Sequence, residues 1–307
     1  MIAVVVRCHD PSPAAASRLS GWAADCAAAN IDFVVSLDNT QQWRETPRER
    51  RVLKRKRENS SGDGCASQHT SPPSVSPTHR LNRTFAESNA NVHVHRYTES
   101  DLLHHFPGLV PLQKYLLEEM KVREMVTRKC TMAWGFHVEA LILWWVWSQK
   151  KMKKYKYIWV FEDDVGITGN IANLVKEYKE VNADLLTDHA IPMNEEWYWK
   201  DVHTENFFTM IGGAGKICAR EHVQRMSHKL MERLTTLCMK HQVHAWSEAF
   251  TSSVAHHASD LTVSGFHETT IGDPYKWNGR VSEEDWSKIV EEEEGELPPR
   301  LFHALKF

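Results

Sequence analysis

The sequence predicts an α/β fold with a mostly parallel central sheet flanked by helices. The chain of 307 residues opens with a strand, a helix and a second strand, which is how a parallel sheet usually begins. Short apolar segments continue to alternate with helical ones further along. Hydrophobic residues make up 42% and charged residues 25% of the chain, which supplies a core of ordinary size. We therefore expect a single domain over residues 1–307.

The opening strand–helix–strand unit has clear boundaries. Residues 2–8 are apolar and rich in valine, which predicts a buried strand. Ser12 and Pro13 then supply a helix cap and a first-turn proline, and the alanine-rich helix is expected to end near Asn30. Residues 31–37 predict a second strand. No G-x-G-x-x-G motif occurs here, so the common dinucleotide-binding fingerprint is absent.

Residues 43–90 differ from the rest of the chain. A run of arginines and lysines between positions 44 and 57 precedes a stretch rich in Ser, Pro and Thr. Neither part has helical or strand periodicity, so we expect a disordered insertion within the domain. The basic run leaves two interpretations open: a patch for nuclear import or for contact with nucleic acid, and a solvated charged loop.

The later elements follow from periodicity and turn residues. Residues 134–150 are apolar nearly all round, which predicts a buried helix. Residues 207–219 predict two strands separated by a glycine-rich break, and residues 220–240 predict a long amphipathic helix. The other predicted elements are helical segments at 100–129, 171–181 and 247–257 and strands at 92–95, 183–187 and 261–266.

Composition narrows the classes of partner and location. The net charge of −3 argues against a protein whose whole surface binds nucleic acid. The six cysteines form no C-x-x-C pair and match no zinc-binding spacing, so we expect scattered reduced thiols. We recognise no signal peptide and no apolar run of the roughly 20 residues that a membrane span needs. The compartment stays open: these observations indicate the cytoplasm or the nucleus, unless the chain is a fragment of a secretory-pathway protein.

The strongest functional signal lies at the end of a predicted strand, residues 157–161. Three consecutive carboxylates follow it: Glu162, Asp163 and Asp164. Crowded negative charge at the end of a buried strand is costly unless a positive group compensates it. A divalent cation is suitable, because hard ions bind carboxylate oxygens and α/β sheets bind their ligands at this edge. A solvated acidic turn is the alternative interpretation.

The acidic triplet and its surroundings resemble a known enzyme family. A strand–helix–strand opening, a long helix and then a strand that ends in clustered aspartates is similar to the nucleotide-sugar glycosyltransferases of the GT-A fold, a Rossmann-like domain. With Val165 the triplet reads E-D-D-V, which resembles the motif of the lipopolysaccharide and collagen galactosyltransferase family. His137 lies in the comparable upstream helix. The resemblance covers most of the chain outside residues 43–90.

The resemblance implies a divalent metal, Mn²⁺ or Mg²⁺, that binds the diphosphate of the donor and stabilises it as a leaving group. Asp164 is expected to bind the metal directly. Asp163 is expected to bind the metal or the donor, and Glu162 to reach the ribose or to bind the metal through water. His267 lies in a segment similar to the C-terminal element of glycogenin-like enzymes. It is expected to complete the metal shell, and Lys276 to contact the diphosphate.

Two further residues are candidates for donor and acceptor chemistry. Asp38, at the end of the second strand, is expected near the base or ribose of the donor, with a turn or cap role as the alternative. Glu248 lies in a Trp-Ser-Glu segment that resembles a downstream acidic motif of the family. It is the expected general base for an acceptor hydroxyl, and a helix-start acid favoured by the helix dipole is its alternative. The glycines within 211–215 resemble the acceptor-side strand.

Together these observations predict a metal-dependent glycosyltransferase. It would move a sugar from a nucleotide-diphosphate donor, UDP-linked rather than GDP-linked, to a hydroxyl of a glycan, a protein or a small molecule. Two alternatives stay open. One is a nucleotidyltransferase of the same fold, although the loop after the first strand lacks the glycine that such enzymes use. The other is a non-catalytic binding or scaffold protein whose basic loop contacts nucleic acid.

Overall fold

The structure is a computed structural model. It describes residues 1–9, 11–39, 92–118, 132–151, 154–213, 215–275, 279–293, 298–305 and 307. The insertion predicted at 43–90 and the candidate Lys276 therefore lie outside the described residues.

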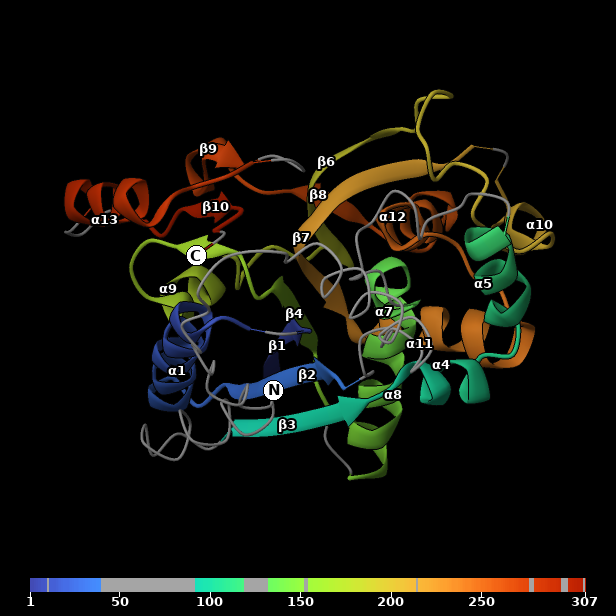
Figure 1. Cartoon of the computed structure of the whole chain (residues 1–307), viewed down its shortest axis with the longest axis horizontal. Helices are drawn as coiled ribbons and strands as arrows, with labels where there is room; N and C mark the ends of the chain where they lie inside the picture. The colour runs from blue at the N-terminus through green and yellow to red at the C-terminus, as the bar shows by residue number, and fades with distance from the viewer. Residues whose placement is uncertain are drawn as a thin grey trace, which may run out of the picture.

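A seven-stranded sheet runs through the centre of the molecule (Figure 1). Its strands are β1 (Ile2–Cys8), β2 (Asp32–Asp38), β3 (Val92–Tyr97), β4 (Tyr157–Glu162), β6 (Leu185–Pro192), β7 (Ile217–Ser227) and β8 (Val263–Gly265). They lie in the order β3-β2-β1-β4-β7-β6-β8. The first four are parallel, β7 is antiparallel to both neighbours, and β6 is parallel to β8. The predicted α/β fold with a mostly parallel sheet is confirmed.

Helices cover both faces of the central sheet. Side chains alternate between the two faces along a strand, so each face presents apolar side chains on which helices pack. The described helices are α1 (Pro13–Ala28), α4 (Glu99–His105), α5 (Leu109–Glu118), α7 (Met132–Gly135), α8 (His137–Lys150), α9 (Ile171–Glu177), α10 (Phe207–Ile211), α11 (His228–Thr235), α12 (Ser247–His257) and α13 (Glu283–Glu292), with a π-helix, η1 (Thr236–Lys240), and a 3₁₀ turn, η2 (Glu268–Thr270). Val4 and Val6 of β1 pack into the core with α1 and α9, whereas Ala3 and Val5 pack with α8, α11 and α12.

Local signals set the boundaries of α1 as expected. Ser12 caps the helix, since its hydroxyl accepts a hydrogen bond from the Ala15 backbone N–H at 3.0 Å, and Pro13 occupies the first turn. Just beyond the helix, Asn30 adopts a left-handed conformation with φ 56°. No helix in the described part of the chain is long and apolar enough to cross a membrane.

A small second sheet carries the C-terminal segment to the acidic turn. Its strands are β5 (Gly166–Ile167), β10 (Leu301–His303) and β9 (Ile271–Tyr275), in the order β5-β10-β9. Just after β10, the Leu305 backbone N–H donates to the Asp164 carbonyl at 2.7 Å. A side chain at Gly166 would lie only 2.7–2.8 Å from Trp286 and Leu305, so glycine is needed for this close approach. Segments about 140 positions apart in the sequence thereby lie side by side.

Two predicted elements are wrong between residues 207 and 240. Residues 207–211 form helix α10, not a strand, and Gly212 ends it with φ 73°. Residues 220–227 belong to strand β7, and helix begins only at His228. The polar residues of β7 gave the segment an amphipathic helical pattern, yet they are buried, and three examples are Glu221, His222 and Arg225. Arg225, for instance, donates hydrogen bonds to three backbone carbonyls, which compensates its burial.

Candidate metal-binding site at the acidic strand end

The acidic triplet lies at the carboxyl end of β4, beside the end of β1. Glu162 is the last residue of the strand, and Asp163 and Asp164 occupy the following turn. All three are partly buried. Arg7 of β1 is directly opposite Glu162 in the parallel register, and its guanidinium lies 3.2 Å from Glu162 Oε1. The negative charge of this turn is therefore partly compensated by a cation of the neighbouring strand.

Two histidines complete a cluster around Glu162. His222 comes from β7, and its Nδ1 lies 2.6 Å from Glu162 Oε2. His303 comes from β10, and its Nε2 lies 3.3 Å from Glu162 Oε2 and 3.4 Å from Asp164 Oδ1. The two imidazole rings are stacked, with their centroids 3.4 Å apart and their planes 12° from parallel. Both histidines are buried, so strands far apart in the sequence deliver their imidazoles to one point.

Charge coupling within the cluster shifts the pKa values of its members. Burial opposes ionisation of Glu162, but the charge and hydrogen bond of His222, with help from His303 and Arg7, hold the pKa of Glu162 well below its usual range. Burial likewise disfavours a charged His303. The hydrogen bonds and charges of Asp164 and Glu162 outweigh it, and they raise the pKa of His303 to about 9. The carboxylates of the site therefore favour the protonated form of His303.

The residues present fit a divalent metal ion. Glu162, His222 and His303 each offer one donor atom, and these three atoms lie within 4.8 Å of one another. The carboxylate of Glu162 can only accept, so His222 Nδ1 carries the proton, and the lone pair is on Nε2. That Nε2 is buried and has no hydrogen-bond partner among the described residues. A histidine held by a carboxylate with its other nitrogen available is the usual arrangement of a metal ligand.

A second buried carboxylate, Glu221, shares Arg7 with the cluster. Glu221 of β7 is buried, and its carboxylate lies 2.9 Å from His137 Nδ1 and 3.6 Å from the Arg7 guanidinium. Burial favours a neutral Glu221, but His137 and Arg7 outweigh this effect and lower its pKa. His137, the first residue of α8, is therefore paired with a buried carboxylate of β7. The cation of Arg7 is shared between Glu162 and Glu221.

Glu248 is in the first turn of α12, as the sequence predicted. The start of this helix is tied to the start of α8, since the Ser247 hydroxyl accepts from the His137 N–H at 2.6 Å and donates to the Gly135 carbonyl. Burial is the main reason that the pKa of Glu248 rises to about 8, and the negative charges of Glu221 and Glu162 add to it. The charge state of Glu248 is therefore coupled to the carboxylates Glu221 and Glu162. A carboxyl whose pKa is near the working pH suits proton transfer.

Asp38 and Asp163 lie at neighbouring strand ends. Asp38 closes β2, is buried, and has its carboxylate 3.0 Å from His9 Nδ1. The backbone carbonyl of Asp163 accepts a hydrogen bond from Arg18 of α1 at 2.7 Å. Burial and, next, the charge of Asp163 raise the pKa of the Cys8 thiol well above its ordinary value. Both aspartates thus belong to the edge of the sheet where the carboxyl ends of β1, β2 and β4 meet.

His267 lies elsewhere. It is exposed, its ring stacks on Tyr178 at a centroid distance of 5.4 Å, and its backbone N–H donates to the Tyr178 hydroxyl. Tyr178 packs edge-to-face on Trp159 in the middle of β4. The C-terminal histidine beside the acidic turn is His303, and His267 does not belong to the cluster. Sequence reasoning also missed His222 and Arg7, although the shared strand-end position of Arg7 and Glu162 is a signal that could have indicated Arg7.

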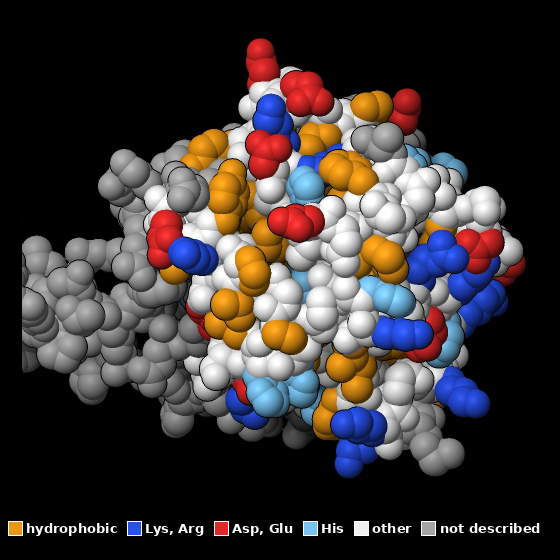
Figure 2. Space-filling view, turned by 90° about the vertical axis from the view of Figure 1, so that its right-hand side faces the viewer, with side chains coloured by type: hydrophobic (Ala, Val, Ile, Leu, Met, Phe, Trp, Pro, Cys, Tyr) orange, Lys and Arg blue, Asp and Glu red, His pale blue; other side chains and the backbone are white. Residues whose placement is uncertain are grey.

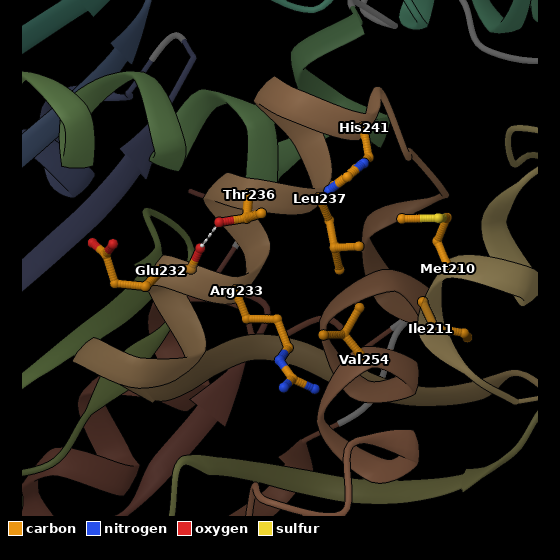
Figure 3. A pocket seen from close by; sticks show the side chains of 8 residues that line it. All are labelled: Met210, Ile211, Glu232, Arg233, Thr236, Leu237, His241 and Val254. Carbon is orange, nitrogen blue, oxygen red and sulfur yellow. Dashed lines mark hydrogen bonds between the residues drawn. The ribbon is translucent and has the colours of Figure 1, made fainter.

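A separate hollow of about 430 Å³ lies between α10, α11, η1 and α12 (Figure 3). None of the cluster residues lines it. Its lining residues are Met210, Ile211, Glu232, Arg233, Thr236, Leu237, His241 and Val254. Figure 2 shows the side of the molecule that carries α5 and α10, where hydrophobic, basic and histidine side chains are interspersed. That view shows no single apolar patch.

Glycosyltransferases of the GT-A fold are among the solved structures that this chain resembles. Core-mannan synthase A from Aspergillus fumigatus, in a Mn/GDP form, shares 11% identity over 86% of this chain and 72% of its own, with a TM-score of 0.42. Mouse xyloside xylosyltransferase 1, in an apo form, shares 10% identity over 98% and 97%, with a TM-score of 0.36. The galactosyltransferase LgtC, in complex with donor and acceptor sugar analogs, shares 9% over 98% and 86%, with a TM-score of 0.33.

No protein-family model matches the chain, and no curated protein sequence matches it. Identities and scores as low as those of the solved structures assign neither a substrate nor the role of any residue. Both have to be argued from the site itself.

Proposed function

We propose that this chain is a metal-dependent glycosyltransferase that moves a sugar from a nucleotide-diphosphate donor to an acceptor hydroxyl. The observation that carries the proposal is the cluster of Glu162, His222 and His303 at the carboxyl end of the central strand β4. In α/β sheets this edge is where ligands bind. Donor atoms of both carboxylate and imidazole type suit Mn²⁺ better than Mg²⁺, which prefers oxygen ligands alone.

In this proposal Glu162, His222 and His303 hold the metal, and Asp164 lies close enough to His303 to take part. His303 takes the role that the sequence resemblance had given to His267. When bound, the ion supplies positive charge that neutralises the diphosphate and stabilises it as a leaving group. Arg7 holds Glu162 from the side of β1, so the carboxylate keeps its position whether or not the metal is present.

Asp38 and Asp163 are proposed to orient the nucleotide part of the donor. They close β2 and follow β4, and β1 lies between these two strands. The buried carboxylate of Asp38 is fixed by its contact with His9, which makes it a directional acceptor for a ribose hydroxyl. A UDP-linked donor remains our expectation from the sequence resemblance.

Glu248 is proposed as the general base that takes the proton of the acceptor hydroxyl. Its raised pKa, about 8, lets a carboxyl accept a proton near the working pH. It lies in the first turn of α12, whose start is fixed to α8 through Ser247. Bringing a metal to the neighbouring cluster adds positive charge, which lowers the pKa of Glu248 and prepares the base when the donor is bound.

The experiment is a turnover assay on a panel of UDP-, GDP- and CDP-linked sugars, with and without Mn²⁺. We expect release of nucleoside diphosphate that depends on the cation and falls about a hundredfold or more in His222→Ala, since this variant loses a proposed metal ligand. His256→Ala is the matched control, because His256 is exposed on α12, outside the cluster.

The products separate the candidate functions. Release of pyrophosphate from a nucleoside triphosphate would show nucleotidyl transfer and refute the proposal. Absence of turnover with every donor, together with unchanged stability of the protein in Mn²⁺ and nucleotide, would favour a non-catalytic protein. A bound ligand at a hundred times its Kd stabilises a protein by about 2.7 kcal/mol, so binding without turnover is readily seen.

A further inference from the structure

A second cluster of metal-type donors lies in the helical layer, away from the acidic strand end. It consists of Glu139 on α8, Cys238 on η1 and His244, which precedes α12. All three side chains are fully buried, with no exposed surface. One donor atom from each lies within 4.8 Å of the other two. The spacing of the cysteines in the sequence gave no sign of this cluster, because its ligands come from three separate elements.

Hydrogen bonds around Gln242 fix the orientation of its side-chain amide. The amide nitrogen donates to the Met239 carbonyl at 3.0 Å, and the amide oxygen accepts from the Gly108 N–H at 2.9 Å. That same oxygen faces His244 Nε2 at 3.5 Å. At 3.5 Å this contact is weak, so it does not by itself fix the tautomer of the His244 ring.

The other nitrogen of His244 faces a carboxylate. Nδ1 lies 2.8 Å from Glu139 Oε1, and since a carboxylate only accepts, either a proton on Nδ1 or a metal ion must lie between the two atoms. A proton on Nδ1 donates to the carboxylate, and it gives a buried ion pair when the ring carries both protons. The alternative is a metal ion, for which an imidazole whose second nitrogen is hydrogen-bonded is the usual ligand.

Two further observations favour the metal. Glu139 Oε2 is buried and has no hydrogen-bond partner among the described residues, which a simple ion pair with His244 leaves unexplained. The Cys238 sulfur lies within reach of the other two donor atoms, although a thiol adds nothing to an ion pair. A metal ion uses the carboxylate, the thiolate and the imidazole together, and it compensates the buried negative charge.

The surrounding structure holds the donors rigidly. Cys238 lies in a π-helical turn, a local insertion that is frequent at functional sites. The His244 ring is packed edge-to-face on Phe106 at a centroid distance of 5.8 Å. A side chain at Gly108 would lie 2.8 Å from this ring, so glycine keeps the space that the imidazole occupies.

We propose that Glu139, Cys238 and His244 bind a zinc ion that stabilises the helical layer. Thiolate, imidazole and carboxylate are the three ligand types of protein-bound zinc. The site is independent of the proposed glycosyl transfer, because it shares no residue with the cluster around Glu162.

The experiment measures metal in the purified full-length chain. Elemental analysis is expected to find about one zinc per chain that survives dialysis, and Co²⁺ exchanged into the protein is expected to give thiolate charge-transfer absorption and tetrahedral ligand-field bands. Cys238→Ser should lose most of the zinc and the charge-transfer band. Cys26→Ser is the matched control, since Cys26 is an equally buried thiol on α1. His303→Ala should keep the zinc even where it loses Mn²⁺-dependent turnover.

The outcomes distinguish a bound zinc ion from a buried ion pair without relying on one variant. The Co²⁺ spectrum is recorded on the unaltered protein, so it tests for a thiolate ligand even where Cys238→Ser does not fold. A chain that takes up no zinc after incubation with the metal, or whose Co²⁺ form shows no thiolate band, refutes the proposal and leaves a buried ion pair. Zinc that is retained in Cys238→Ser but lost in His303→Ala also refutes it, because the metal would then belong to the acidic strand end.

Discussion

Replacing Glu248 by glutamine is expected to stabilise the protein increasingly as the pH rises. The pKa of Glu248 is raised from its ordinary value of 4.5 to about 8, first by burial and then by the charges of Glu221 and Glu162. The folded protein therefore holds this proton to higher pH than the unfolded chain does. Folding takes up a proton between about pH 4.5 and 8, so this carboxyl makes stability fall as the pH rises through that window.

The magnitude follows from the same shift. Each pKa unit corresponds to about 1.4 kcal/mol, so a rise from 4.5 to about 8 sets an upper limit of about 5 kcal/mol. Glu248 keeps some contact with solvent, and screening reduces the expected cost above pH 8 to about 2–3 kcal/mol. Glutamine is the neutral counterpart of the protonated carboxyl. The variant and the unaltered protein should therefore be about equally stable near pH 5.

The assay is urea denaturation of the two proteins from pH 5 to 8.5 in the presence of a chelator, since a bound cation would alter the field at Glu248. Glu205→Gln serves as the control, because Glu205 is exposed and its removal should give no such trend. A difference in unfolding free energy that stays constant across this pH range would refute the reasoning. It would mean that Glu248 titrates as an ordinary solvated carboxyl.

Three further changes have defined outcomes. Mn²⁺ affinity, measured by calorimetry, should rise about tenfold per pH unit up to about pH 9, because His303 must lose its proton to bind a metal; an affinity independent of pH would exclude His303 as a ligand. Gly166→Ala should cost about 1–3 kcal/mol of unfolding free energy, since the new methyl group would press on Trp286. In contrast, Gly21→Ala, with open space around it on α1, should add up to about 1 kcal/mol; equal effects of the two substitutions would contradict this account. Arg7→Met should cost about 3–5 kcal/mol at neutral pH and less in acid, where protonated carboxyls need no cation; denaturation with the same loss at both pH values would show that packing, not charge, is responsible.

The sequence was informative where structure is local. The cap at Ser12 and the strand–helix–strand opening depend on neighbouring residues, and both were predicted within two positions. Helix 247–257 was predicted at its observed ends, which placed Glu248 in a first helical turn. The carboxylates after β4 likewise lie at the strand end that their order in the chain implied.

The sequence failed where structure depends on distant partners. β7 carries polar residues that are buried because Arg7, His137 and backbone carbonyls pair with them, and no local pattern shows such partners. The expectation for His267 failed for the same reason. The pairing of β10 with β5 brings His303, the last residue of β10, to Asp164, and no local pattern indicates that pairing.

The proposed metal-binding cluster and the charged residues that support it, Arg7 and Glu221, come from almost the whole length of the chain. Arg7 bonds the Glu221 carbonyl across 214 positions, and His303 contacts a carboxylate that was laid down 141 positions earlier. Closing loops of this size costs entropy before any contact compensates it, and folding slows as such contacts accumulate. A partly folded chain therefore lacks the assembled set of metal ligands. We expect Mn²⁺ to bind late in refolding. The amount of tightly bound Mn²⁺ would then measure the fraction of molecules whose central sheet is complete.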